Sequence, residues 1–284
     1  MAGFGERLAQ ASRGRPAVVG LDPRIERFPA RYRELAAKDA GEALTAWSDM
    51  VLTAVAGIVP MVKPQSAFYE QFGSAGVAAL EATCRRAREL DLLVLLDAKR
   101  GDIGSTAEAY ARATLDDDGP MGADAVTLNP YLGPESLEPF LARRDAGKGF
   151  FLLVRTSNPG AGALQRHGSP AVVEQVSGWI REWNAGDAWG SVGAVVGATV
   201  PAEAAELRAM LPNTWLLVPG YGAQGGTAED VAALFERGQG AVVTSSRGIT
   251  YAGPSEVEAY DEDPASVVSA HAKAMIDDLG RVAG

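Results

Sequence analysis

The stretch LLVLLDAKRGD at residues 92–102 joins a continuous apolar run to a cluster of charged residues. Such a run, without the alternation of a half-exposed strand, is typical of a β-strand that is buried on both faces. The charges come at its carboxyl end, where Gly101 allows the chain to turn. This stretch predicts a buried parallel strand that brings acidic and basic side chains to one edge of a sheet.

Further apolar runs of the same kind are spread along the chain, each bounded by Gly, Pro or polar residues. They are residues 17–21, 61–63, 125–129, 150–155, 192–198, 215–218 and 241–244. Between the runs lie stretches with helical spacing of apolar residues. These are residues 42–58, 77–90, 105–115, 134–143, 170–183, 202–210, 228–237 and 265–279.

About eight strand-then-helix units therefore fill the chain, which predicts an α/β fold of the (β/α)8 barrel type. A doubly wound open sheet has the same local pattern and remains the alternative, because local patterns do not show closure. There is no Ser/Gly linker or shift in composition, so we predict a single domain over residues 1–284. Residues 24–39 resemble an insertion after the first strand, and residues 160–169 a long loop after the fifth.

The composition excludes several classes of protein. The 284 residues include 26 Lys and Arg against 36 Asp and Glu, a net charge of −10. This acidity argues against sequence-independent binding to nucleic acid, which needs a basic surface. It does not argue against a small anionic substrate, because a few local Lys and Arg residues can reverse the field inside one cleft.

The chain also lacks the residues that membrane proteins, zinc proteins and Ser-His-Asp enzymes need. No run is long enough to span a membrane, and the first 16 residues lack the apolar core of a signal peptide, so the expected location is the cytoplasm. The single Cys84 allows no internal disulfide, and with only His167 and His271 beside it a Cys/His zinc site is not expected. Neither histidine accompanies a Gly-x-Ser-x-Gly motif, which argues against a Ser-His-Asp enzyme.

Polar residues follow almost every predicted strand, at the end where barrel enzymes carry their chemistry. They are Asp22, Lys63, Asp97, Lys99, Asn129, residues 155–158, Gln224 and Arg247. One polar residue at a strand end is ordinary, because strand ends meet solvent. The joint pattern predicts a functional site.

The densest cluster combines carboxylates with ammonium groups. Asp97 and Lys99 are two residues apart, so in an extended chain their side chains project on the same face, and Asp102 can return after the turn at Gly101. With Lys63 nearby, each neighbouring pair of opposite charges about 4 Å apart would contribute a Coulomb attraction of roughly 4 kcal/mol at an effective dielectric of 20. A fixed ammonium can stabilise a developing anion and donate a proton. A purely structural ion-pair network would have the same spacing, and that alternative stays open.

The glycine-rich stretch PGYGAQGG at residues 219–226 contains the pattern G-x-G-x-x-G after a predicted strand. It lies too near the carboxyl terminus for a dinucleotide domain to follow, and the next strand ends in TSSR rather than in an acid. Its place after the seventh strand instead favours a phosphate cradle, completed by Arg247 after the eighth. A flexible turn is the alternative.

Together these pieces resemble orotidine 5′-phosphate decarboxylase, most closely its longer bacterial subgroup. The matching pieces are GLDP at 20–23, VKPQ at 62–65, DAKRGDI at 97–103, LNPY at 128–131, RTSNP at 155–159, PGYGAQGG at 219–226 and SSRGI at 245–249. They occur in order, one per strand end. The element D-x-K-x-x-D is shared by a wider barrel family, but its combination with Lys63, Gln224 and Arg247 is specific.

The resemblance implies conversion of orotidine 5′-phosphate to UMP, the last step of UMP synthesis, without a metal or organic cofactor. It implies that Lys99 stabilises a carbanion at C6 of the pyrimidine ring and then protonates it. Asp97 and Asp102 would flank Lys99, with Asp97 nearest the substrate carboxylate. Lys63 and Asp22 would hold the ribose hydroxyls and complete the charged array.

The remaining implied substrate contacts are Ile103, Thr106, Asn129, Ser157, Pro219, Gln224, Gly225 and Arg247. Ser157 would contact the pyrimidine ring, whereas Gln224 and Arg247 would hold the 5′-phosphate under a mobile loop formed by Pro219 and the glycines. Asp102, Ile103 and Thr106 would reach the neighbouring subunit's site, which implies a homodimer. The chain departs from the family's pattern in residues 24–39 and 160–169.

Two alternatives remain. The first is a 3-keto-hexulose-phosphate synthase or keto-gulonate-phosphate decarboxylase, which share D-x-K-x-x-D but use a magnesium-bound enediolate. Lys63 argues against them, because they tend to carry an acid there. The second is a catalytically silent protein that binds a nucleotide phosphate. The costly charge array of Asp97, Lys99 and Asp102 argues against it, because a pure binder gains nothing from such an array.

Overall fold

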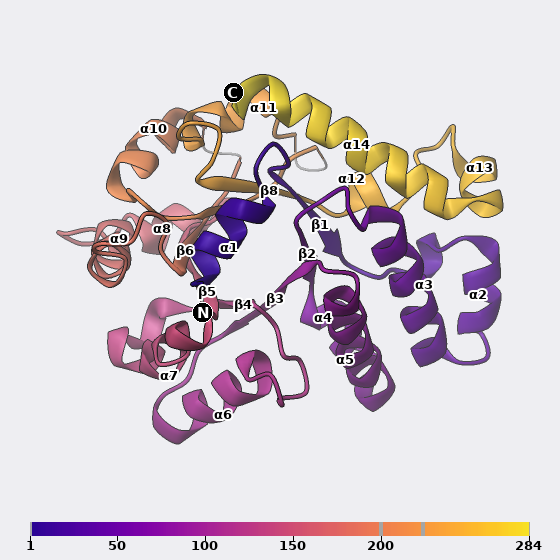
Figure 1. The fold of residues 1–284 in the computed structure, drawn as a ribbon, viewed down its shortest axis with the longest axis horizontal. Coiled ribbons are helices and arrows are strands. Elements are labelled where there is room, and N and C mark those ends of the chain that lie inside the picture. Colours follow the sequence, from indigo (N-terminus) through magenta and orange to yellow (C-terminus); the bar gives the residue numbers. More distant parts are fainter. Residues whose placement is uncertain (1, 199–200, 223–224, 284) are drawn as a thin grey trace.

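Eight parallel strands close into a barrel in the order β1 to β8, so the predicted (β/α)8 barrel is confirmed and the open sheet is excluded. The computed structural model describes residues 2–198, 201–222 and 225–283. Figure 1 looks along the barrel, with helices surrounding the strands. The strands are β1 (Ala17–Leu21), β2 (Met61–Pro64), β3 (Leu93–Arg100), β4 (Ala125–Leu128), β5 (Gly149–Arg155), β6 (Val192–Val196), β7 (Leu216–Pro219) and β8 (Ala241–Ser245).

The main helices begin and end close to the predicted stretches. They are α3 (Ala40–Val55), α5 (Gly73–Glu89), α6 (Gly104–Leu115), α7 (Glu138–Leu141), α9 (Val172–Trp183), α10 (Pro201–Met210), α11 (Ala228–Val231) and α14 (Pro264–Ala283). The stretch 134–143 is not one helix but a 3-10 turn, η3 (Pro134–Leu137), followed by α7. Pro139 explains the break, because it has no N–H to continue the hydrogen bonding. The stretch 228–237 likewise divides into α11 and η5 (Ala232–Leu234).

Several short elements were not predicted. They are α1 (Phe4–Ala11), η1 (Ile25–Arg27), α2 (Ala30–Ala36), α4 (Ser66–Glu70), η2 (Pro130–Leu132), η4 (Arg144–Ala146), α8 (Ala161–Gln165), α12 (Arg247–Thr250) and α13 (Val257–Glu262). Residues 24–39 thus form η1 and α2, and residues 160–169 contain α8. The insertion is an integral part of the fold, because the Phe28 ring stacks on Trp47 with centroids 4.7 Å apart and the backbone N–H of Ala30 donates to Asp261.

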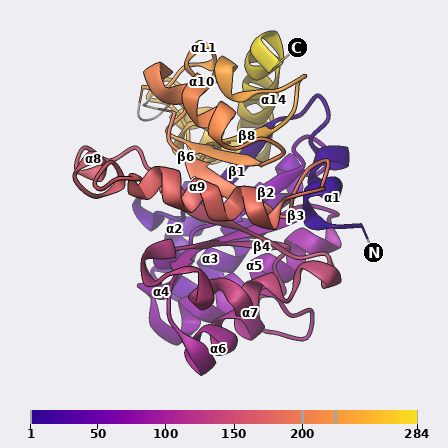
Figure 2. The ribbon, with the colours of Figure 1, turned by 90° about the vertical axis from the view of Figure 1, so that its left-hand side faces the viewer.

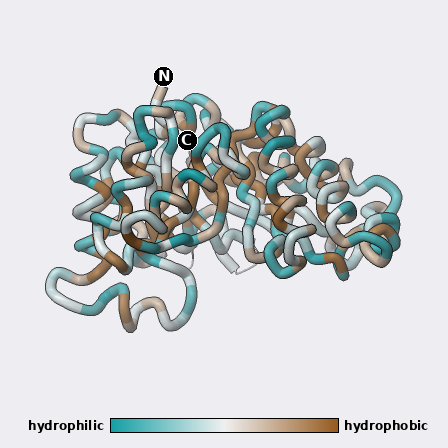
Figure 3. Tube along the Cα trace, turned by 90° about the horizontal axis from the view of Figure 1, so that it is seen from below, coloured by the Kyte–Doolittle hydropathy of each residue, from teal (hydrophilic) through white to brown (hydrophobic). Residues whose placement is uncertain are grey.

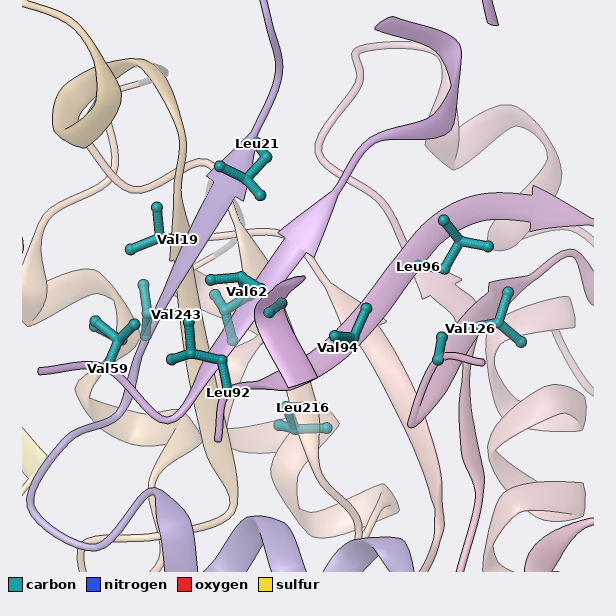
Figure 4. Packing of buried hydrophobic residues seen from close by; sticks show 14 of the residues in the cluster. Val19, Leu21, Val59, Val62, Leu92, Val94, Leu96, Val126, Leu216 and Val243 are labelled. Carbon is teal, nitrogen blue, oxygen red and sulfur yellow. The ribbon is translucent and has the colours of Figure 1, made fainter. Parts of the chain in front are cut away.

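The strands are buried on both faces, which explains why their sequences are continuously apolar. Along β1, Val19 belongs to the layer between barrel and helices, whereas Val18 belongs to the barrel interior. Figure 4 shows side chains of the outer layer from neighbouring strands, among them Val62 and Val94. The interior cluster comprises Phe4, Leu8, Val18, Met61, Leu95, Ala125, Phe151, Val195, Trp215, Leu217 and Val242.

Helix α1 closes the amino-terminal end of the barrel and leaves the carboxyl end for chemistry. Phe4 and Leu8 belong to the interior cluster, and the indole N–H of Trp215 donates to the carbonyl oxygen of Gly5 at 3.0 Å. Helix α1 also packs closely against the backbone at Trp189. Glycine is required at position 5 for this contact, because a Cβ there would lie 2.2 Å from the carbonyl oxygen of Trp189. Figure 2 shows α1 and α8 on opposite sides of the barrel.

The ring of helices has the amphipathic character expected of a barrel's outer layer. Hydrophobic and hydrophilic residues alternate along it in Figure 3. Over the described part of the chain, no helix combines the length and the apolar character that a membrane span needs.

Candidate active site

Asp97 is the centre of the predicted charge cluster. Its Oδ2 accepts hydrogen bonds from Nζ of Lys63 at 2.8 Å and from Nε2 of Gln65 at 2.9 Å. Its Oδ1 accepts from Nζ of Lys99 at 2.5 Å and from the hydroxyl of Thr127 at 2.9 Å. Strands β2, β3 and β4 therefore converge on one carboxylate, which lies between two ammonium groups as predicted.

Lys99 reaches Asp97 through a bulge rather than through regular extended chain. The register between β3 and β4 shifts after Leu96, and Lys99 has a φ of +47°, in the left-handed region that non-glycine residues rarely adopt. The N–H groups of Ala98 and Lys99 both donate to the hydroxyl oxygen of Thr127, at 3.0 and 2.9 Å. The expectation of an extended strand here is wrong, because this hydroxyl takes the place of a regular ladder partner and holds the strained backbone.

The buried pair at the centre is ionised. Burial would raise the pKa of the Asp97 carboxyl, but the positive charges of Lys63 and Lys99 outweigh it and hold that pKa well below its usual range. Burial would similarly lower the pKa of the Lys63 ammonium, but Asp97 and Asp22 raise it above its ordinary value. Asp97 and Lys63 therefore stabilise each other's ionised form inside the protein.

The two lysines differ in their access to the cavity. The side chain of Lys63 is 7% exposed, whereas that of Lys99 is 45% exposed. Lys99 is thus the more accessible ammonium, whereas Lys63 is largely covered, although it too lines the cavity.

Asp22 directly follows β1, and one of its carboxylate oxygens accepts no hydrogen bond from the described residues. Its Oδ1 is buried and has no hydrogen-bond partner among the described residues. Its backbone carbonyl accepts from the hydroxyl of Tyr251 at 2.7 Å, which fixes the turn. A buried carboxylate oxygen without a partner is costly, so this atom is suited to accept a hydrogen bond from a ligand hydroxyl.

A cavity of about 400 Å³ opens above this cluster at the carboxyl ends of the strands. Its lining residues are Lys63, Asp97, Lys99, Thr127, Leu153, Thr156, Ser157, Asn158, Gln165, Val195, Leu217 and Pro219. The structure therefore gathers five of the implied catalytic and substrate-binding residues around one hollow, Lys63, Asp97, Lys99, Ser157 and Pro219, together with Thr156 and Asn158 of the predicted polar stretch 155–158. A larger hollow of about 550 Å³ lies beside α1, and its lining contains none of the predicted site residues.

Other predicted residues lie apart from this cavity. Asp102 does not join the lysines within the described chain; its Oδ1 instead accepts from the N–H of Ile103 at 2.8 Å. The expected alternation of two carboxylates with two ammonium groups is therefore wrong for the single chain, because β3 ends at Arg100 and the Asp102 carboxylate accepts from the backbone of the next residue instead of from a lysine. The side chain of Ile103 is 57% exposed, and Thr106 is also exposed. Asn129 caps η2, with its Oδ1 accepting from the N–H of Tyr131 at 3.0 Å.

The predicted phosphate cradle is described in part. Gly220, Gly222 and Gly225 have φ values of +109°, +69° and +87°, which explains why glycine occupies these positions. The N–H of Gly222 donates to the carbonyl of Gly226 at 2.8 Å and closes the turn, whereas Gln224 lies outside the described residues. Arg247 begins α12, is exposed, and forms no salt bridge with any described residue, so its guanidinium is available to an anion.

Three polar residues of the site were not predicted. Thr127 carries the only hydroxyl in the run AVTL, and its inward position on β4 could have indicated its role. Gln65 lies just beyond β2, two residues after Lys63, the spacing that places both side chains on the same face of an extended chain. Gln165 gave no signal, because only the folding of the loop after β5 brings it back to the cavity.

Comparisons with known proteins agree with one another and with the resemblance seen in the sequence. The family model described as "Orotidine 5'-phosphate decarboxylase / HUMPS family" matches residues 18–262. An orotidine 5′-phosphate decarboxylase from Rhodopirellula baltica is 47% identical over 261 residues, covering 86% of each chain. One from Salinispora arenicola is 45% identical over 262 residues, covering 89% of this chain and 92% of the relative. The solved structure of Leishmania donovani OMP decarboxylase superimposes with a TM-score of 0.79 at 32% identity and covers 99% of both chains.

Proposed function

The chain belongs to the orotidine 5′-phosphate decarboxylase / HUMPS family, and from this premise we propose that it is a carboxy-lyase that converts orotidine 5′-phosphate to UMP and CO2. The observation that carries the proposal is the buried Asp97 carboxylate held between Lys63 and Lys99, with Lys99 facing the cavity. This array offers a fixed positive charge where a carbanion would form.

The chemical step breaks the bond between C6 of the pyrimidine ring and its carboxylate. The electron pair stays at C6, CO2 leaves, and Nζ of Lys99 transfers a proton to C6 to give UMP. The ring cannot delocalise this carbanion, so the protein must stabilise it electrostatically. An adjacent ammonium interacts more strongly as the negative charge develops, which is the requirement for catalysis. Lys99 is partly exposed and can regain its proton from solvent.

Asp97 has two roles in this proposal. Its four hydrogen bonds fix the positions of both lysines. Beside the substrate carboxylate it would also destabilise the bound ground state, and loss of CO2 would relieve that repulsion. Binding energy from the distant phosphate offsets the strain, so the phosphate contacts are expected to affect turnover as well as binding.

The remaining contacts are those that the family resemblance implies, and of these Lys63, Ser157 and Pro219 line the cavity. We assign the ribose hydroxyls to the unpaired oxygen of Asp22 and to Lys63, and the pyrimidine ring to Ser157. We assign the 5′-phosphate to Arg247 with Gln224 and Gly225, beneath the loop that begins at Pro219. Asn129, which follows β4, is retained as an implied substrate contact.

We also propose a homodimer in which Asp102, Ile103 and Thr106 complete the neighbouring subunit's site. The exposed Ile103 and Tyr131 support this assignment, because large apolar side chains in open solvent are suited to a protein interface. Sedimentation velocity would test it, and a monomer at micromolar concentration would contradict it.

The test of the activity is the ultraviolet absorbance of orotidine 5′-phosphate mixed with purified protein in buffer containing EDTA. Rapid conversion to UMP is expected. Turnover of a sugar phosphate that depends on magnesium, with no conversion of the nucleotide, would support the enediolate enzymes instead. UMP binding without turnover of either substrate would support a silent binding protein.

A further inference from the structure

The loop after β5 forms one wall of the cavity with residues from both of its ends. Thr156, Ser157 and Asn158 begin the loop, and Gln165 ends its short helix α8. All four line the cavity, although Gln165 lies nine residues beyond Thr156 in the sequence. Figure 2 shows α8 projecting on the side opposite α1.

The side chain of Gln165 clamps the start of the loop at two points. Its Oε1 accepts from the backbone N–H of Thr156 at 3.0 Å, and its Nε2 donates to the hydroxyl oxygen of Thr156 at 2.8 Å. That hydroxyl in turn donates to Oδ1 of Asn158 at 2.6 Å. One amide group thus orients the residues on both sides of Ser157.

Ser157 is also held closely from behind. A Cβ on Gly197, just after β6, would lie 2.8 Å from the Cβ of Ser157, so glycine is required for the loop to pack against β6. The N–H of Gly197 donates to the carbonyl of Arg155 at 2.8 Å. The backbone at Ser157 therefore has little freedom while the clamp is closed.

The base of the loop has a separate anchor outside the cavity. Glu203 of α10 accepts from Arg155 at 2.9 Å and from Arg166 at 2.5 Å. These arginines flank the loop on either side, so Glu203 joins its two ends. Loss of the Gln165 amide would consequently leave the loop closed at its base.

We propose that Gln165 is a positioning residue for the reaction: its amide group holds Thr156 and thereby places Ser157 against the pyrimidine ring of the substrate. This inference rests on the proposed function, because that function supplies the ring. It assigns to Gln165 the fine placement of the ring, and to Glu203 the general shape of the loop.

The test combines Gln165→Ala with Ser157→Ala in a double-mutant cycle, with Leu164→Ala as the matched control. Leu164 lies beside Gln165 in α8 and is exposed. We expect Gln165→Ala to lower kcat/KM for orotidine 5′-phosphate about 10-fold to 100-fold, the scale of a displacement near 1 Å. In the Ser157→Ala background the same change should cost less than about twofold, because coupled residues are not additive.

Binding measurements separate positioning from a general loss of structure. UMP carries the ring, whereas ribose 5-phosphate lacks it. Gln165→Ala should weaken UMP binding while leaving ribose 5-phosphate binding and the melting temperature close to those of Leu164→Ala. Gln165→Glu keeps the acceptor for the N–H of Thr156 and should recover part of the loss.

Each contrary result has a distinct meaning. Equal weakening of UMP and ribose 5-phosphate, or full additivity with Ser157→Ala, would overturn the inference. If the wild type fails to convert orotidine 5′-phosphate while Gln165→Ala still selectively loses UMP affinity, the proposed function fails, and Gln165 places a bound pyrimidine ring without serving this reaction. If the wild type is active and Gln165→Ala equals it in kcat/KM and UMP affinity, the positioning role alone fails.

Discussion

Both ends of the barrel carry ion pairs in which at least one partner is largely buried, but these pairs are built differently. At the amino end, Asp124 binds Arg7 at 2.8 Å and also accepts from the backbone N–H of Val94. Lys148 there binds Asp117 at 2.7 Å and also donates to the carbonyl of Ala123. These charges connect side chains to backbone, so they fasten α1 and the loops that precede the strands.

At the carboxyl end, the described residues that donate to the Asp97 carboxylate all do so through their side chains. These donors meet beside an open cavity. The same kind of interaction therefore stabilises the fold at one end and presents charge to a ligand at the other. This contrast separates effects on stability from effects on turnover, and each of the following variants tests it.

Lys99→Ala is expected to have the largest effect and to act on turnover alone. It removes both the proton donor and the charge that stabilises the carbanion, so kcat should fall by about 10⁴-fold or more. Because Lys99 is partly exposed, its loss should change the unfolding midpoint little. Steady-state kinetics and thermal melting would measure both. Turnover near that of the wild type would remove the basis of the proposed mechanism.

Asp97→Asn should damage both turnover and stability, because it leaves the buried Lys63 ammonium without its carboxylate. A broken buried pair costs about 3–5 kcal/mol in the free energy of unfolding. The pKa of Asp97 is lowered in the folded protein, so its stabilising effect is fully present above the unfolded value near 3.9 and is lost only as pH falls through the folded value.

Urea unfolding at several pH values would test this pH dependence. The stability gap between wild type and Asp97→Asn should be the same at pH 7 and pH 5 and should shrink only below about pH 4. A gap that already narrows between pH 7 and pH 5 would show that Asp97 does not keep its charge in the way described.

Arg247→Ala tests whether a remote charge at the carboxyl end serves the chemistry. We expect a loss of about 10²-fold in kcat/KM, corresponding to the roughly 1.5–3 kcal/mol of a charge-assisted hydrogen bond. Part of this loss should appear in kcat, because phosphate binding energy offsets the repulsion beside Asp97. A change confined to KM would show that the phosphate contributes to binding only. The free energy of unfolding should not change, because Arg247 forms no salt bridge with the described residues.

Asp124→Asn is expected to have the smallest effect, and to change stability rather than turnover. It weakens the pair with Arg7, which is partly exposed, so the free energy of unfolding should fall by about 1–2 kcal/mol. Activity measured well below the melting temperature should equal that of the wild type. A loss of kcat without a loss of stability would contradict the division between the two ends.

The sequence allowed the barrel to be predicted because its strands are buried on both faces, which makes each run continuously apolar. It allowed Lys63, Asp97 and Lys99 to be placed together because the carboxyl ends of parallel strands meet at one edge. Helix α1 was not predicted, since its role depends on an open barrel end that exists only after folding. The bulge at Lys99 was missed because it depends on a hydroxyl from the next strand, and Gln165 because it depends on the path of a whole loop.

The closing of the amino end by α1 has a practical consequence for handling the protein. The amino terminus lies on the opposite side of the barrel from α8 (Figure 2), and residues of the loop that contains α8 line the cavity. A bead, an electrode surface or a fused reporter attached there would hold the molecule with its cavity facing the solution. Attachment through residues near α8 would instead crowd the entrance, so the choice of tether alone would decide whether an immobilised sample remains accessible to its substrate.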